Sequence, residues 1–189
     1  MKASVTVIKC PPIGTNCYIV STNDSAVVID PAGGAGTISN SIRMLGVKLC
    51  AVLLTHGHFD HIGAVDELYK EYKMPILIHE NDLSLSQSTA LNCADLFGMG
   101  NILITSPCDT FQDESILVFG DISLRAIHTP GHTAGSSCFV TDDLVFTGDT
   151  LFHNGVGRTD LPTSSETELS RSLKRLEKII SGRKIYPGH

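Results

Sequence analysis

The sequence predicts an α/β protein in which two β-sheets pack face to face and helices cover their outer surfaces. Two observations lead to this prediction. Short apolar and β-branched segments typical of strands occur in both halves of the chain, and helical segments separate them. The 189 residues suit one domain with a sizeable core, and 42% hydrophobic with 18% charged residues is ordinary for a globular enzyme.

Ten segments are expected to form strands, because their β-branched and apolar residues are bounded by turn-forming pairs such as Asn23-Asp24. They are residues 4–8, 17–21, 26–30, 51–55, 75–79, 116–118, 122–128, 137–141, 144–147 and 184–186. The pair Asp142-Asp143 is expected to join two of them as a hairpin.

Three helices are expected where apolar residues recur at helical spacing, over residues 37–45, 62–72 and 165–180. Ser165 and Glu168 form a capping-box pattern at the start of the last helix, and Gly182 follows its end. Residues 81–97, rich in Ser and Asn, form a weaker helical pattern that we expect to cover part of the molecule.

A cluster of metal-binding side chains follows the apolar segment 51–54. His56, His58, Asp60 and His61 lie within six positions, so a strand that ends there presents them from one short turn. Imidazole and carboxylate suit zinc, and also iron or manganese. Four such side chains can hardly all reach one ion, so two adjacent ions are implied. Polar groups beside a buried strand cost free energy unless something pairs with them, which favours a metal site over packing.

Three later positions extend this site. His132 lies in a Pro-Gly loop after a strand, Asp149 directly follows an apolar strand, and His189 follows the last short strand. Loops held by a rigid scaffold often carry binding residues, so all three are candidate ligands.

Four other residues are left open. His79 and His153 are not assigned to metal. His128 either orients a ligand or loop, or belongs to the packing. Asp30, at the end of an apolar strand, either hydrogen-bonds a ligand or caps a turn.

In order, the motifs HxHxDH, TPGHTxGS, GDT and PGH resemble those of the metallo-β-lactamase superfamily and, within it, the glyoxalase II-like hydrolases. The resemblance extends from Asn16 to His189. It implies an αββα sandwich with the metals at one sheet edge. It also implies that residues 1–189 form a single domain of this type, without the C-terminal helical extension of typical glyoxalase II.

The resemblance also implies a ligand set for each ion. The first ion is expected on His56, His58 and His132, the second on Asp60, His61 and His189, with Asp149 bridging both. Asp60 and Asp149 are the carboxylates expected in catalysis. The expected cofactors are two divalent metal ions, zinc foremost, although iron and manganese also suit these ligands.

The function implied is metal-dependent hydrolysis of a thioester such as S-lactoylglutathione by a hydroxide that bridges the two metals. A thiolate leaves without a strong general acid, which fits a site with no separate proton donor. Another hydrolase, acting on lactones or esters, stays open. So does a persulfide dioxygenase with one iron, whose GRTD loop resembles residues 157–160. Leu161-Pro162 and Pro187-Gly188 depart from that branch. A metal that only staples the fold is disfavoured, since structural zinc sites are closed four-ligand sets.

Arg158 is the candidate substrate-binding residue. It matches a basic position that contacts glutathione in the typical enzyme, but Asp160 stands where an aromatic residue is expected. A salt bridge between Arg158 and Asp160 is the alternative.

The resemblance implies a small-molecule substrate as the partner, and the oligomeric state stays open. The net charge is −6 and no basic run occurs, which argues against nucleic acid. No run is long enough to span a membrane, and the N-terminus lacks the apolar segment of a signal peptide, so the cytoplasm is expected. The six cysteines are scattered, without a CxxC pair, so free thiols are expected.

Overall fold

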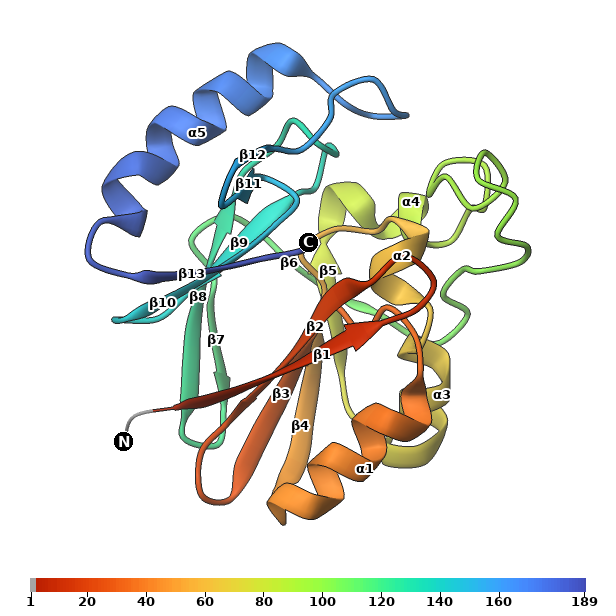
Figure 1. The fold of residues 1–189 in the computed structure, drawn as a ribbon, viewed down its shortest axis with the longest axis vertical. Helices are drawn as coiled ribbons and strands as arrows, with labels where there is room; N and C mark the ends of the chain where they lie inside the picture. Colours follow the sequence, from red (N-terminus) through yellow and green to blue (C-terminus); the bar gives the residue numbers. More distant parts are fainter. Residues whose placement is uncertain (1–2) are drawn as a thin grey trace.

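Two β-sheets form the centre of the structure, a computed structural model that describes residues 3–189 (Figure 1). The first sheet has the order β1 (Ser4–Cys10), β2 (Thr15–Ser21), β3 (Ser25–Ile29), β4 (Lys48–Leu53), β5 (Ile76–His79), β6 (Asp109–Phe111). The second has the order β13 (Lys184–Pro187), β10 (Leu144–Gly148), β9 (Ser137–Val140), β8 (Ile122–His128), β7 (Ile116–Phe119). A small hairpin joins β11 (Leu151–Phe152) to β12 (Gly155–Val156).

Both sheets are mixed. In the first, β1 to β3 are antiparallel, and β3 to β6 run parallel. In the second, β7 to β10 are antiparallel, and β13 lies parallel to β10. The carboxyl ends of β4 and β5 therefore lie at one edge of their sheet, and those of β10 and β13 at one edge of theirs.

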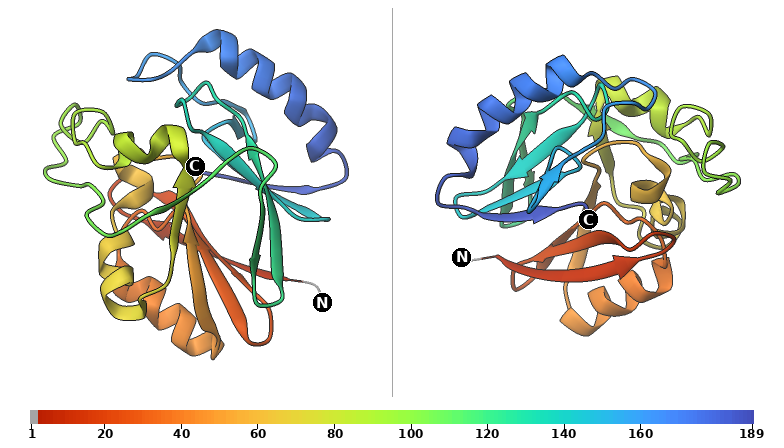
Figure 2. Two further views of the ribbon diagram at one scale, coloured as in Figure 1. Left: turned by 180° about the vertical axis from the view of Figure 1, so that it is seen from behind. Right: turned by 45° about the horizontal axis from the view of Figure 1, so that its top comes forward.

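Helices cover the outer face of each sheet (Figure 2). The helices α1 (Ala35–Leu45) and α3 (Val65–Tyr72) pack on the first sheet, and α5 (Glu166–Ile180) packs on the second. Three short elements lie near the sheet edges: α2 (Phe59–Ile62), the 3-10 turn η1 (Glu80–Asp82) and α4 (Leu83–Ser86). The layer order is thus helix, sheet, sheet, helix, which confirms the predicted sandwich.

The alternation of side chains along β3 shows how the layers are held together. All five residues of β3 are buried, because both faces of the strand are covered. Ala26 and Val28 point into the cluster shared with α1 and α3, whereas Val27 and Ile29 point into the core between the sheets. Both faces of this strand are therefore removed from water.

The ten predicted strands are all present, with bounds shifted by up to three residues. The strands β6, β11 and β12 were not predicted, because segments of three and two residues carry no periodic pattern. The hairpin at Asp142-Asp143 is confirmed, since β9 and β10 pair antiparallel. All six cysteines are free thiols, as expected.

Two helix predictions were wrong in part. The helix expected over 62–72 is divided into α2 and α3, because Ala64 N–H donates to Pro31 O at 2.8 Å and a side chain at Gly63 would overlap Ala32 O. The pattern over 81–97 is helical only as far as Ser86. Beyond it, the Asn92 amide accepts a hydrogen bond from Ala94 N–H, which favours turns over helix.

Half of the expected capping box is present. Ser165 Oγ accepts from Glu168 N–H at 3.3 Å and caps α5. Ser165 N–H donates to Gly131 O at 2.8 Å, and the Glu168 carboxylate accepts from Arg171. The start of α5 is thereby attached to the loop that carries His132.

In residues 3–189, no helix is long and apolar enough to cross a membrane.

Ser165→Ala is expected to lower the free energy of unfolding by about 1 kcal/mol, because the α5 cap is lost. Ser170→Ala, an exposed position of the same helix, is the matched control and should leave it unchanged or slightly higher. Urea unfolding monitored by circular dichroism measures both. Equal losses in the two variants would contradict the capping role.

Candidate metal centre and active site

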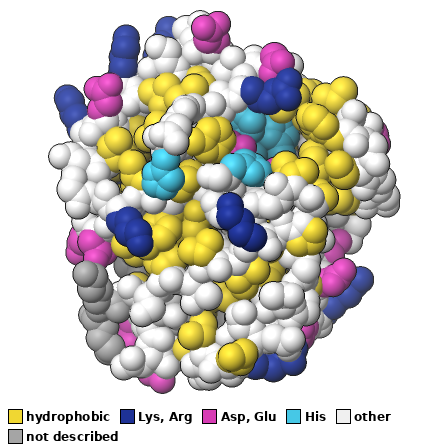
Figure 3. Space-filling view, in the orientation of Figure 1, with side chains coloured by type: hydrophobic (Ala, Val, Ile, Leu, Met, Phe, Trp, Pro, Cys, Tyr) yellow, Lys and Arg dark blue, Asp and Glu magenta, His cyan; other side chains and the backbone are white. Residues whose placement is uncertain are grey.

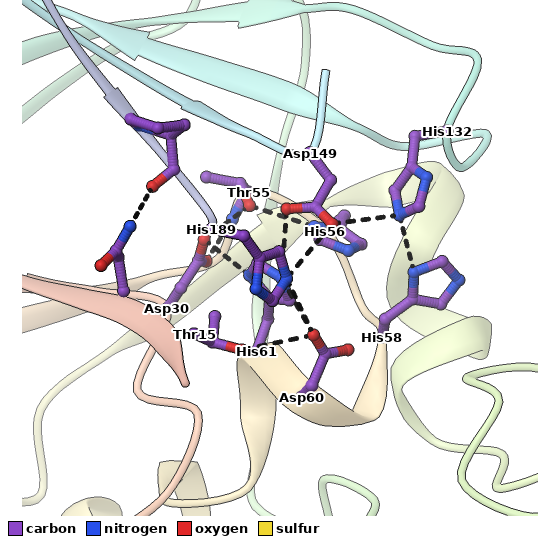
Figure 4. Close-up of polar contacts among 12 residues, drawn as sticks. Thr15, Asp30, Thr55, His56, His58, Asp60, His61, His132, Asp149 and His189 are labelled. Carbon is purple, nitrogen blue, oxygen red and sulfur yellow. Dashed lines mark hydrogen bonds and ion pairs between the residues drawn. The ribbon is translucent and has the colours of Figure 1, made fainter. Parts of the chain in front are cut away.

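Seven side chains from separate parts of the chain converge where the edges of the two sheets meet (Figure 4). The turn after β4 supplies four of them, and the loops or ends after β8, β10 and β13 supply one each. They are His56, His58, Asp60, His61, His132, Asp149 and His189. The structure therefore brings together every residue that the sequence suggested as a metal ligand.

The seven fall into three overlapping groups whose ligand atoms lie within 4.8 Å of one another. These groups are His56, His58 and His132; Asp60, His61 and His189; and His56, His61 and Asp149. The first two match the two expected ligand sets.

Asp149 lies between the two sets. Its Oδ1 is 3.4 Å from His61 Nε2, and its Oδ2 is 3.7 Å from His132 Nε2 and 3.5 Å from His189 Nε2. One carboxylate thus faces both sets, as a bridging ligand would.

Unsatisfied polar atoms show that this arrangement fits metal ions. In the described part of the chain, the buried side-chain atoms without a hydrogen-bond partner are His56 Nε2, His58 Nε2, His61 Nε2 and Asp149 Oδ1. All four belong to the cluster. An unpaired buried polar group costs about 1–3 kcal/mol, so four together at one place are the donor set expected of a metal centre.

The charge states of the cluster follow from burial and from its carboxylates. Burial, aided by neighbouring imidazoles, lowers the pKa of His56 well below its usual value and that of His58 to about 3. Both rings are therefore neutral at pH 7, the form that binds a metal. Burial opposes ionisation of Asp149, but His61 and His189 outweigh it and hold the pKa of Asp149 well below its usual value.

Asp30 orients His61 and so resolves an alternative that the sequence left open. Its Oδ2 lies 3.0 Å from His61 Nδ1, which leaves His61 Nε2 directed at the cluster. The same carboxylate accepts from Thr55 N–H at 2.8 Å and from Thr55 Oγ1 at 2.7 Å. Asp30 thus fixes both the ring and the start of the turn that carries the histidines.

Asp82 is a residue that the sequence did not indicate. It is fully buried and accepts from Gly57 N–H at 3.0 Å, Thr133 Oγ1 at 2.7 Å and Gly135 N–H at 2.6 Å. It therefore joins the turn that bears His58 to the loop that bears His132. Burial raises its pKa, although these hydrogen bonds oppose the shift. No local motif surrounds Asp82, so only its contacts reveal the role.

The start of β2 positions His189. Asn16 N–H donates to Gly188 O at 2.8 Å, and Asn16 Nδ2 donates to Pro187 O at 2.9 Å. A side chain at Gly188 would overlap Asp149 Oδ1, so only glycine allows the chain to pass this close. The end of β13, in the second sheet, is thus tied to β2 of the first sheet.

The other histidines lie outside the cluster. His128 Nε2 lies 2.8 Å from Ala134 O, and its ring stacks on His79 at 4.0 Å between centroids. His128 therefore supports the loop that carries His132, which is the loop-orienting alternative of the sequence. His153 is exposed.

A cavity of about 290 Å³ opens directly over the cluster (Figure 3). Ligand-type residues form one side, and apolar side chains border the rest. Arg158 also lines it, and its backbone O lies 2.9 Å from His132 Nδ1. A larger cavity of about 650 Å³, near the turn between β9 and β10, contains none of the seven residues.

The salt bridge between Arg158 and Asp160 is present. Arg158 Nε donates to Asp160 Oδ1 at 2.6 Å and Nη2 donates to Oδ2 at 2.8 Å. This pairing was one of the two alternatives for Arg158. A contact between Arg158 and substrate stays a prediction.

An αββα sandwich with a buried His/Asp cluster under an open cavity defines a metal-dependent enzyme of the metallo-hydrolase class. The chain belongs to the metallo-beta-lactamase superfamily, whose family model matches residues 10–189. It is a metallo-hydrolase of that superfamily.

Named relatives cover most of the chain. It is 36% identical over 173 residues to "Probable metallo-hydrolase YqgX" of Bacillus subtilis, covering 90% of this chain and 81% of the relative. It is 34% identical over 176 residues to "Hydroxyacylglutathione hydrolase GloC" of Haemophilus influenzae, covering 90% and 82%.

Solved structures agree with this assignment. The BLEG-1 B3 metallo-beta-lactamase superposes with a TM-score of 0.91 at 32% identity, covering 98% of this chain and 91% of that one. TTHA1623 in a di-iron-bound form superposes with a TM-score of 0.88 at 33% identity, covering 97% and 91%.

Asp82→Asn is expected to lower metal affinity at least about tenfold. Three groups donate hydrogen bonds to the Asp82 carboxylate, whereas an asparagine amide replaces one acceptor oxygen with an NH2 donor group. Asp66→Asn is the matched control, since Asp66 also accepts from backbone N–H groups, of Thr105 and Ser106, yet contacts none of the seven residues. Competition with a chelating dye measures the affinity. An unchanged affinity in Asp82→Asn would remove the positioning role.

Proposed function

We propose that this protein hydrolyses a thioester at a centre of two divalent metal ions, as glyoxalase II-like enzymes do. The observation that carries the proposal is Asp149, one carboxylate shared between two ligand sets under an open cavity. Zinc is the proposed metal, and iron suits the same imidazole and carboxylate ligands. The hydroxyacylglutathione hydrolase activity for which the GloC relative is named and the di-iron form of TTHA1623 support a binuclear thioesterase.

The lining of the cavity supports a thiolate leaving group. Apart from the seven ligand-type residues, the titratable groups among the described lining residues are Cys93 and Arg158. Burial raises the pKa of Cys93, and Arg158 stays cationic beside Asp160. Neither is suited to protonate a poor leaving group. A thiolate, with a parent pKa of about 8.5, leaves without such help, whereas an alkoxide or amine anion does not.

In the proposed reaction, water adds its oxygen to the carbonyl carbon, the C–S bond breaks, and the remaining proton goes to the thiol sulfur. When bound, the two ions supply the activated water and the Lewis acid that polarises the carbonyl. His56, His58 and His132 would hold one side of the centre, and Asp60, His61 and His189 would hold the other. Asp30 and Asp82 keep these groups in place without touching substrate.

Metal content distinguishes the proposed binuclear hydrolase from the alternative, a persulfide dioxygenase with one iron ion. Two ions per chain and hydrolysis without oxygen uptake fit the proposal. One iron per chain with oxygen uptake would favour the dioxygenase. Hydrolysis of a β-lactam but of no thioester would place the chain in a third branch of the superfamily.

His58→Ala is expected to lower thioester hydrolysis by at least about a hundredfold, since metal-based stabilisation of the transition state amounts to several kcal/mol. His153→Ala is the matched control, because His153 is exposed and lies outside the cluster. S-lactoylglutathione and a neutral acyl thioester serve as substrates, and metal content is measured on the same samples. Full activity in His58→Ala would end the proposal.

Chelation is expected to lower the melting temperature, because the ions bind the folded state and four buried atoms lose their partner. With free metal at about 1,000 times its dissociation constant, bound metal adds about 4 kcal/mol per site. Calorimetry with and without EDTA measures the shift. The shift should shrink in a double variant, His58→Ala with Asp149→Ala; an equal shift there would show that EDTA acts elsewhere.

A further inference from the structure

We infer that the acyl group of the substrate is an apolar chain held in the 290 Å³ cavity. Substrate selection then depends on contacts between the cavity and this acyl chain, and not on recognition of a charged thiol such as glutathione. This inference rests on the proposed thioester hydrolysis. It adds the chemical class of the acyl group and the residues that recognise it.

Apolar side chains from three separate segments line the cavity together with the metal cluster. Ile13 comes from the turn between β1 and β2, Phe97 and Met99 come from the turns after α4, and Leu161 follows the β11–β12 hairpin. Ile13 is 55% exposed and Phe97 is 45% exposed, although both are large and apolar. Apolar groups gathered at the mouth of a catalytic cavity mark a surface that a ligand covers.

The wall is held in place by internal contacts. Asn92 is fully buried. Its side-chain Nδ2 donates to Ile102 O at 2.8 Å, and its backbone O accepts from Phe59 N–H at 3.0 Å. The Phe97 ring packs on Phe59, with 5.7 Å between centroids. Phe59 follows His58 directly, so the apolar wall is anchored to the turn that carries the metal ligands.

The charges around the cavity do not suit glutathione, which carries two carboxylates. No Lys or Arg occurs between residues 74 and 124, a segment that includes the wall residues Phe97 and Met99. Among the described residues that line the cavity, Arg158 is the only Lys or Arg, and Asp160 neutralises it through two hydrogen bonds. The cavity therefore offers apolar contact and no net positive charge from side chains outside the metal cluster.

The test uses the full-length, metal-loaded protein and one series of thioesters. Acetyl, butanoyl and hexanoyl groups are placed on N-acetylcysteamine, a neutral thiol, and the same groups are placed on glutathione. We expect kcat/KM to rise about three- to fourfold for each CH₂ group that enters the cavity. The two thiols should differ by less than about tenfold for the same acyl group.

Variants locate the effect. Phe97→Ala and Met99→Ala are expected to lower the ratio of kcat/KM for the hexanoyl ester to kcat/KM for the acetyl ester about tenfold. Leu96→Ala is the matched control, because Leu96 is 66% exposed on the same segment and does not line the cavity. Equal losses for both esters would indicate damage to the site in general and would overturn the assignment.

Two further outcomes would overturn the inference while leaving thioester hydrolysis intact. One is a kcat/KM that is flat or falls with acyl length, and the other is a preference for the glutathione thiol of more than about tenfold. If no thioester is hydrolysed, the proposed function fails, and binding then decides the inference separately. S-hexyl-N-acetylcysteamine, a non-hydrolysable thioether, should bind at least about tenfold more tightly than the S-methyl compound by calorimetry, and Phe97→Ala should reduce that ratio. Equal affinities would refute an apolar cavity function.

Discussion

Three imidazole nitrogens and one carboxylate oxygen lie buried without hydrogen-bond partners, and the surrounding fold is organised to hold them facing one another. Such burial opposes folding by several kcal/mol in total, so the scaffold must supply that stability elsewhere. It does so through strands whose two faces are both covered, as in β3, and through the carboxylates of Asp30 and Asp82. The cost is recovered when metal ions bind, which couples metal content to stability.

The site also depends on both sheets being closed against each other. His56 and His58 follow the first sheet, whereas Asp149 and His189 follow the second. Backbone contacts align the two edges: Ser137 N–H, in the second sheet, donates to Thr55 O at 2.8 Å, and Asn16 N–H, in the first sheet, donates to Gly188 O at 2.8 Å. A partly opened sandwich would therefore separate the ligands, and integrity of the metal centre reports on integrity of the fold.

The sequence predicted which candidate ligands the fold would bring together, because their signals are local. His56, His58, Asp60 and His61 share one turn, and His132, Asp149 and His189 each follow an apolar strand beside Gly or Pro. Asp82 gave no such signal, since its three donors come from positions 57, 133 and 135, brought together only by tertiary structure. The cavity wall was missed for the same reason. Residues 81–97 were predicted as a weak helix, whereas buried Asn92 stabilises the turns that place Phe97 at the cavity.

The candidate metal ligands and the residues proposed to select the substrate come from different parts of the fold. The ligands lie at or just after strand ends, whereas the apolar wall residues lie in turns. Relatives of similar identity to this chain are named for different activities: GloC, at 34%, is a hydroxyacylglutathione hydrolase, and BLEG-1, at 32%, is a B3 metallo-beta-lactamase. A shared fold therefore cannot decide which substrate is cleaved. The decision must come from residues outside the ligand set. In this chain those residues include apolar side chains from three segments, and Arg158, the one Lys or Arg among the described lining residues, is already paired. Desolvation of an acyl chain then provides binding free energy that no metal ligand supplies. Substitutions in the wall residues can change this binding free energy while the metal cluster stays the same.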